Sequence, residues 1–123
     1  MTEQFSDLIY SAPDGLKLHA RVYGDRIHAG MPVVCLPGLS RNARDFHELA
    51  LRLSTRHVHP RRVVVFDYRG RGLSAYDRNW RNYNVLVEAD DVLAGMIAAG
   101  VEKAHFIATS RGGLVVHRIG VVR

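Results

Sequence analysis

Three short runs of mostly apolar residues constrain the fold of this chain more than any other feature. They lie at residues 32–36, 62–66 and 104–108, and none shows a strict alternation of apolar and polar side chains. Strands without this alternation are typical of sheets that are covered on both faces. The runs therefore predict a parallel sheet with helices on each side.

A hairpin is expected before the first of these runs. Residues 5–11 and 16–23 flank Ala12-Pro13-Asp14-Gly15, where proline sets φ and glycine accepts a positive φ. In the second arm apolar and polar side chains alternate, which predicts a half-exposed antiparallel strand. The inward residues are Leu16, Leu18, Ala20 and Val22, and the outward residues are Lys17, His19, Arg21 and Tyr23.

Helical periodicity appears in two places between the apolar runs. It follows Asn42, with Phe46, Leu49, Ala50 and Leu53 on one face, and Asn84, with Leu86, Ala89, Leu93 and Ile97. Both asparagines are candidate N-caps, and Gly100 is expected to close the second helix. The sequence thus predicts an α/β fold in which an N-terminal antiparallel hairpin leads into a mostly parallel sheet with flanking helices.

Composition limits the remaining possibilities. With 123 residues, 47% of them hydrophobic, the chain forms one domain at most. It has no apolar run near the ~20 residues of a membrane span and no visible signal peptide, so we expect a cytoplasmic protein without a membrane partner. Cys35 is the only cysteine and lies among apolar neighbours, which favours a small buried side chain over a reactive thiol.

The basic balance of the chain raises the question of nucleic-acid binding. The formal net charge is +5, but the arginines are scattered singly or in pairs, with no run and no nucleic-acid-binding signature. This distribution favours a solvated, arginine-rich surface, and no nucleic-acid partner is expected. A non-catalytic basic interaction module remains an alternative, which salt-dependent retention on nucleic acid would reveal.

The stretch from Ala104 to Gly113 predicts a strand, an abrupt turn and a helix, with Ser110 at the turn. A serine hydroxyl attacks a carbonyl only where it stands clear of the backbone, and such a turn presents it there. Small residues, Ala108 and Gly112, are needed where strand and helix approach each other. The N–H of Arg111, at the helix start, is a candidate oxyanion donor. The alternative is an ordinary N-cap serine after a buried strand.

A second oxyanion donor is expected after the first buried run. Pro37-Gly38-Leu39-Ser40 follows that run directly, and a sharp turn at glycine would allow the N–H of Leu39 to face Ser110. The alternative is an ordinary Pro-Gly turn. The segment therefore indicates an oxyanion hole only in combination with the predicted turn at Ser110.

The segment after the second buried run allows a competing interpretation. Residues 70–75 match the Gly-x-Gly-x-x-Gly/Ala fingerprint of dinucleotide-binding proteins, and Asp90 and Asp91 lie near the spacing of a ribose contact. The fingerprint must open a helix, however, and helical periodicity begins only after Asn84. Nucleotide binding through this loop stays an alternative. No cofactor is expected, and no metal, because the histidines, including His57 and His59, show no convincing ligand spacing.

Taken together, three motifs in order resemble the N-terminal half of an alpha/beta-hydrolase-fold protein. They are Pro37-Gly38-Leu39-Ser40, Asp67-x-Arg69-Gly70-x-Gly72-x-Ser74 and Ala108-Thr109-Ser110-Arg111-Gly112. The resemblance implies Ser110 as nucleophile, the N–H groups of Leu39 and Arg111 as oxyanion hole, and a structural role for Arg69 and Ser74. It also implies esterase, lactonase or C–C hydrolase chemistry, because dehalogenases and epoxide hydrolases of this fold carry aspartate at the elbow. Ala108 replaces the usual glycine, and Pro37 stands where many relatives have histidine.

In the resembled fold the triad acid and base follow the nucleophile on later loops, and this chain ends soon after Ser110. We therefore expect residues 1–123 to form a single incomplete domain, inactive alone, whose longer parent hydrolyses a small-molecule substrate. His117 is expected to be a packing or surface residue, and residues 118–123 a poor helix. Strand 104–108 would be an exposed sheet edge, prone to self-association.

Overall fold

The computed structural model describes residues 5–24, 31–37, 46–56, 61–109 and 111–122. The strands are β1 (Phe5–Ser11), β2 (Lys17–Tyr23), β3 (Val33–Leu36), β4 (Val63–Asp67) and β5 (His105–Ala108). The helices are α1 (His47–Leu51), α2 (Val85–Ala99) and α3 (Arg111–Val122), with a π-helical turn, η2 (Arg52–Arg56), and a 3-10 turn, η3 (Trp80–Asn82).

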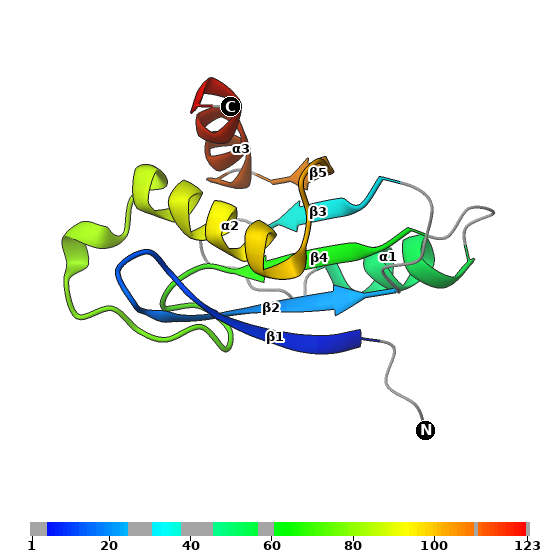
Figure 1. Ribbon diagram of the computed structural model, residues 1–123, viewed down its shortest axis with the longest axis horizontal. Helices are drawn as coiled ribbons and strands as arrows, with labels where there is room; N and C mark the ends of the chain where they lie inside the picture. The colour runs from blue at the N-terminus through cyan, green and yellow to red at the C-terminus, as the bar shows by residue number, and fades with distance from the viewer. Residues whose placement is uncertain (1–4, 25–30, 38–45, 57–60, 110, 123) are drawn as a thin grey trace.

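The five strands form one mixed sheet in the order β1-β2-β4-β3-β5 (Figure 1). The hairpin pair is antiparallel, β2 pairs antiparallel with β4, and β3 lies parallel to both β4 and β5. The predicted α/β architecture, with a hairpin leading into a parallel region, is confirmed. Parallel strands end at the same edge of a sheet, so the segments that follow β3, β4 and β5 leave from one side of the molecule.

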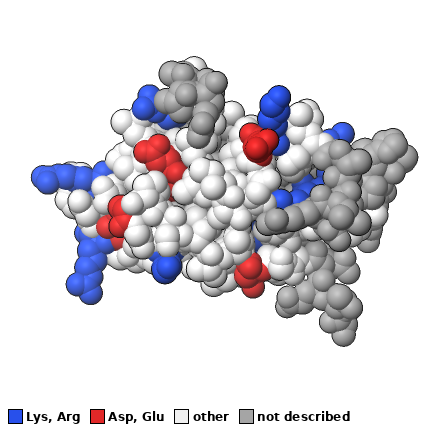
Figure 2. Space-filling model, in the orientation of Figure 1, with Lys and Arg blue, Asp and Glu red and all other residues white. Residues whose placement is uncertain are grey.

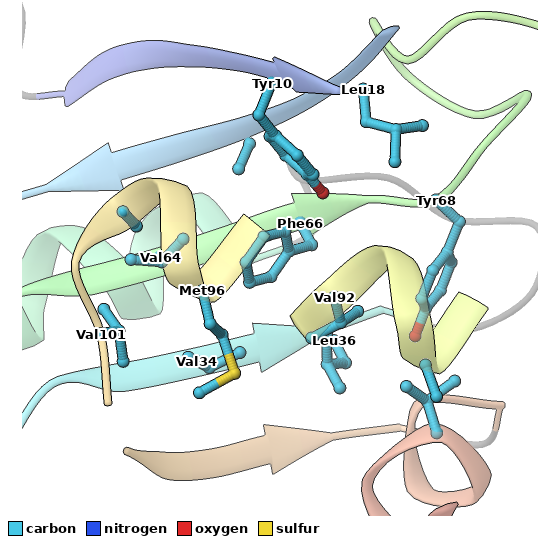
Figure 3. Packing of buried hydrophobic residues seen from close by; sticks show 14 of the residues in the cluster. Tyr10, Leu18, Val34, Leu36, Val64, Phe66, Tyr68, Val92, Met96 and Val101 are labelled. Atoms are coloured by element: carbon cyan, nitrogen blue, oxygen red, sulfur yellow. The ribbon is translucent and has the colours of Figure 1, made fainter. Parts of the chain in front are cut away.

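Helices cover both faces of the sheet. One core packs α2 and α3 against the sheet, and Figure 3 shows Tyr10, Phe66, Val92 and Met96 within it. The other core packs Phe46 and Ala50 of the α1 region against the opposite face. Cys35 is buried in this second core, and burial raises the pKa of its thiol to about 12, as expected for an unreactive cysteine.

The predicted ends of α2 are confirmed. Asn84 caps the first turn, because its side chain accepts a hydrogen bond of 2.9 Å from the N–H of Val87. Gly100 ends the helix in the left-handed region, at φ 74°. For α1, the predicted N-cap Asn42 lies outside the described residues.

The predicted buried face of α2 is only partly right, because Ala89 is buried and Leu93 is partly buried but the other two residues are not. Leu86 and Ile97 are 56% and 74% exposed, whereas the buried residues are Glu88, Ala89, Asp91, Val92, Gly95, Met96 and Ala99. The helix is turned so that Asp91 meets buried Arg69 and Gly95 meets the sheet. Tertiary partners, rather than the periodicity of large side chains, determine the buried face.

Three further expectations needed correction. His19 and Tyr23 on the second hairpin arm are fully buried, because β2 lies inside the sheet between β1 and β4. The strand at 104–108 is not buried on both faces, because β5 ends the sheet order and His105 is exposed. The tail is helical as far as Val122 despite its glycine and β-branched residues, because buried Val115 and Ile119 of α3 pack into the core.

Candidate active site

The passage from β5 to α3 is a tight turn, as the sequence predicted. β5 ends at Ala108, α3 begins at Arg111, and the N–H of Gly112 donates to the carbonyl oxygen of Thr109 at 2.9 Å. A hydrogen bond across four residues reverses the chain within one turn. The strand and the helix are therefore joined abruptly.

Small residues at this turn are required by packing. A Cβ atom added at Gly112 would collide with the carbonyl oxygen of Leu36 and would lie 3.0 Å from the Cβ atoms of Leu36 and Ala108. The same addition at Gly113 would meet nothing within 4 Å. The crowding is thus specific to the side of α3 that faces the ends of β3 and β5, and it gives the physical reason for the small residues at positions 108 and 112.

The end of β3 is hydrogen-bonded to the same turn. The N–H of Thr109 donates to the carbonyl oxygen of Leu36 at 3.2 Å, which extends the β3–β5 pairing by one step. The segment that follows β3 therefore starts beside the start of α3. Arg111, a predicted oxyanion donor, is the first residue of α3, whereas Ser110 and Leu39 lie outside the described residues.

The Gly-rich loop after β4 does not have the geometry of a phosphate cradle. Four of its N–H groups donate to protein carbonyl oxygens, Gly70 to Ala75, Arg71 to Tyr68, Ser74 to Arg71 and Ala75 to Lys17, and that of Leu73 donates to the Asp67 carboxylate. The loop also does not open a helix, because α2 begins only at Val85. Free N–H groups at a helix start are what a pyrophosphate binds, so this loop does not support the nucleotide-binding alternative.

Arg69 holds this loop to the rest of the domain. Its side chain is completely buried and donates to Asp91 at 2.8 and 2.7 Å, to Asp77 at 2.6 Å and to Asp14 at 2.9 Å. These carboxylates, Asp91 first, hold the pKa of Arg69 above its usual value. Burial raises the pKa of Asp91, and the hydrogen bond from Arg69 opposes that rise. The structural role expected of Arg69 is confirmed. Asp91, considered above as a ribose contact, binds Arg69.

His19 is a buried polar residue that the sequence did not single out. Its Nδ1 lies 2.7 Å from an Asp67 carboxylate oxygen and its Nε2 lies 2.7 Å from one of Asp7. Burial lowers the pKa of His19, but the hydrogen bonds to these carboxylates outweigh burial and raise it. The alternating pattern of β2 does not predict that carboxylates from other strands bind His19.

Ser74 completes a serine–histidine–aspartate group that is structural. Its Oγ accepts from the backbone N–H of His19 at 2.9 Å and donates to the backbone oxygen of Asp67 at 2.8 Å. A nucleophilic serine must instead bond to the imidazole ring of its base. The three residues therefore join β2, β4 and the Gly-rich loop, as expected of Ser74.

The described histidines do not lie beside the turn before α3. His105 opens β5, whereas the turn follows its far end, and His47 pairs with the hydroxyl of Tyr23 at 2.7 Å. His117 is exposed, about two turns along α3. Within the described ranges no His, Cys, Asp or Glu cluster suits a metal ion; His57 and His59 fall outside them. None of the helices described could cross a membrane.

Comparisons with known proteins agree with this geometry. Residues 33–123 match the profile of the Alpha/beta hydrolase family. A crystal structure of an alpha/beta hydrolase from Novosphingobium aromaticivorans is 37% identical, with a TM-score of 0.86, over 100% of this chain and 41% of that one. An epoxide hydrolase from Vigna radiata is 23% identical, with a TM-score of 0.85, over 100% of this chain and 36% of its own, which shows the fold alone.

A curated relative is similar over a shorter stretch. The 3-hydroxybutyrate-oligomer hydrolase of Cupriavidus necator is 35% identical over 83 residues, which are 68% of this chain and 27% of the relative. This chain therefore spans less than half the length of the proteins it matches. The family match covers most of the chain, and the strand, turn and helix at its carboxyl-terminal part have the packing that the family's motif requires. The chain belongs to the alpha/beta hydrolase family.

Proposed function

We propose that this chain supplies the nucleophile and the oxyanion hole of a serine hydrolase that cleaves an ester-like carbonyl substrate. Ser110 would be the nucleophile, and the N–H groups of Leu39 and Arg111 would bind the oxyanion. The observation that carries the proposal is the crowding of Gly112 against Leu36 and Ala108. Such close packing of helix against strand is what a nucleophile elbow requires.

The chemistry follows from these roles. The Oγ of Ser110 would attack the substrate carbonyl carbon while its proton passes to a general base, and the carbonyl oxygen would become an oxyanion. N–H groups at the start of α3 and after β3 would stabilise that charge, because those segments leave the same edge of the sheet. The base would return its proton to the leaving oxygen as the intermediate collapses, which expels the alcohol and leaves an acyl-serine. Water would then hydrolyse the acyl-serine, releasing the acid and restoring Ser110.

The general base is expected on chain beyond residue 123. Both ring nitrogens of His19 are bonded to carboxylates, and His105 and His117 lie away from the turn. A serine without a general base keeps an ordinary, weakly nucleophilic hydroxyl. An oxyanion hole alone still accelerates hydrolysis somewhat relative to the uncatalysed reaction in water. The 123-residue chain by itself should therefore be close to inactive.

Oligoesters of hydroxy acids are the first substrate class to test. The Cupriavidus necator relative is named for hydrolysis of 3-hydroxybutyrate oligomers, and hydroxy acids join to one another through ester bonds. A serine at position 110 suits acyl transfer, so an ester is favoured over an epoxide. Short 3-hydroxybutyrate oligomers and p-nitrophenyl esters of short acids are suitable substrates.

The proposal can be tested with the chain and with a longer version that continues beyond residue 123. We expect near-background hydrolysis by the chain alone and turnover by the longer protein. Ser110→Ala should abolish that turnover, whereas Ser40→Ala, at a serine of the predicted oxyanion loop, should retain it because only the Leu39 backbone N–H acts there. Turnover that survives Ser110→Ala would refute the assignment of the nucleophile. Robust Ser110-dependent turnover by the 123-residue chain would refute the absence of a base.

A further inference from the structure

The connection between β4 and α2 exposes large apolar side chains. Leu73 is 69% exposed, and Tyr76 and Trp80 are each 73% exposed; Leu86, in the first turn of α2, is 56% exposed. Single exposed apolar residues are ordinary, but four within one short segment make that segment a candidate interaction surface. We call the segment from Leu73 to Leu86 the aromatic connection.

Its backbone is held in place by hydrogen bonds. The hydroxyl of Tyr83 accepts from the N–H of Asp77 at 2.7 Å and donates to the Asp77 carbonyl oxygen at 2.9 Å. Asn79 caps η3 through a 3.2 Å bond from the N–H of Arg81. A segment ordered in this way loses little conformational entropy when its exposed side chains bind a partner.

The outward charge of the aromatic connection is positive. The carboxylate of Asp77 accepts hydrogen bonds from within the protein, from Arg69 Nη1 at 2.6 Å and from Asn82 Nδ2 at 2.8 Å. Arg78 and Arg81 are exposed and form no ion pair with a described residue. Figure 2 shows Lys and Arg side chains projecting from the end of the molecule where Figure 1 places this connection, with acidic side chains further in.

Although composition alone predicted no membrane partner, we propose that the aromatic connection binds the surface of an anionic lipid bilayer. Tyr and Trp rings are suited to the boundary between headgroups and acyl chains, and leucine inserts below it. Arg78 and Arg81 would meet the anionic headgroups. Exposed leucines at both ends of the segment favour lipid over single-stranded nucleic acid, which would use aromatic stacking and positive charge but has no place for aliphatic side chains.

The single tryptophan of the chain, Trp80, provides a direct readout. Vesicles of equal parts phosphatidylglycerol and phosphatidylcholine should shift its fluorescence to shorter wavelength and protect it from iodide. Vesicles of phosphatidylcholine alone should have a much weaker effect, and salt should reduce binding because it screens charges at the surface. Co-sedimentation with the same vesicles gives the affinity independently of the fluorescence.

Matched variants separate this surface from general charge and hydrophobicity. Arg78→Gln with Arg81→Gln should weaken binding to anionic vesicles roughly 25-fold, from about fivefold for each arginine near the surface. Leu73→Ser with Tyr76→Ser should reduce it comparably and leave net charge unchanged. The controls are Arg52→Gln with Lys103→Gln, and Ile97→Ser. All three are exposed, and Ile97 and Lys103 lie toward the opposite end of the sheet, at the end of α2 and before β5.

Several results would overturn the proposal. They are equal binding to both vesicle types, an unshifted Trp80 spectrum on sedimented protein, and controls that weaken binding as much as the paired variants. Tighter binding to single-stranded oligothymidine than to vesicles would assign the surface to nucleic acid instead. A concentration-dependent shift of Trp80 without vesicles would assign it to a second copy of the chain.

Discussion

At the scale of single residues, glycines fix how closely the helices approach the sheet. Gly112 allows α3 to start against Leu36 and Ala108, whereas Gly113 beside it faces open space. The two glycines have the same helix propensity and differ only in their surroundings. They therefore form a matched pair for testing the geometry at the turn.

Gly112→Ala should lower the free energy of unfolding by about 1–3 kcal/mol, because the added methyl group cannot fit without moving the backbone. Gly113→Ala should raise it by up to about 1 kcal/mol, because alanine is favoured in helices. Urea denaturation followed by circular dichroism measures both. Equal effects of the two substitutions would contradict the close approach of α3 to the ends of β3 and β5.

Arg69 is the residue on which the polar interior depends. Arg69→Met should cost about 3–5 kcal/mol, because Asp91 would remain buried without its partner. Arg69→Met combined with Asp91→Leu should recover most of that loss, since the guanidinium and its most deeply buried partner are removed together. Exposed Arg78→Met is the control and should change stability by less than about 0.5 kcal/mol. Failure of the double variant to recover would show that Asp14 and Asp77 also need the guanidinium.

His19 should make stability depend on pH. Its pKa in the folded chain lies above the ordinary 6.5, so folding binds the proton more tightly. The stabilisation is complete below that ordinary pKa and is lost as the pH rises through the raised one. The free energy of unfolding should therefore fall as the pH rises above about 6.5, and less so in His19→Gln. His105→Gln, at an exposed histidine, should leave the slope unchanged; an equal slope in all three proteins would contradict this role of His19.

At the scale of elements, α2 shows what sequence patterns predict and what they miss. Asn84 and Gly100 were predicted as its ends because caps act through local backbone geometry. Its buried face was predicted only in part, because Asp91 and Gly95 are selected by Arg69 and by the rings of β1 and β4. Likewise, the apolar runs predicted the parallel strands almost to the residue, whereas the burial of His19 depends on carboxylates from two other strands.

Gly95 gives the packing of α2 a direct test. A Cβ atom there would collide with the ring of Phe66 and would lie 2.7 Å from Cζ and 2.8 Å from the hydroxyl oxygen of Tyr10. Gly95→Ala should thus destabilise the chain by about 1–3 kcal/mol although alanine is the better helix former. Ala98→Gly, at an exposed position of α2, should cost about 1 kcal/mol through propensity alone. A stabilising Gly95→Ala would mean that α2 lies farther from the sheet.

At the scale of the whole molecule, the described sheet has two edges, β1 and β5, and β5 is the edge without a formally charged side chain. Among the described strands it has a neighbour, β3, on one side only, and Phe106 and Ile107 are half-buried. By the alternation of parallel pairing, the N–H groups of Phe106 and Ala108 point away from β3. Such an edge pairs readily with another strand, and it carries no proline and no formally charged side chain.

We therefore predict self-association of the 123-residue chain through residues 104–108. Size-exclusion chromatography with light scattering should show dimers or larger species whose proportion rises with concentration. His105→Lys adds a charge at the exposed start of β5 and should shift the chain toward monomer, whereas His117→Lys on α3 should not. A monomer with a sharp thermal transition across the concentration range would contradict this prediction.

The sheet order also determines when parts of the chain can fold during synthesis. β2 pairs with β4, but β3 and α1 lie between them in the sequence. One edge of β2 in the newly made hairpin therefore stays unpaired until β4 has been synthesised. Arg69 can form its two hydrogen bonds to Asp91 only after α2 has been synthesised, because Asp91 lies in that helix. A ribosome that pauses between β4 and α2 would hold a nascent chain in which Arg69 has Asp14 and Asp77 available but lacks its bidentate partner Asp91.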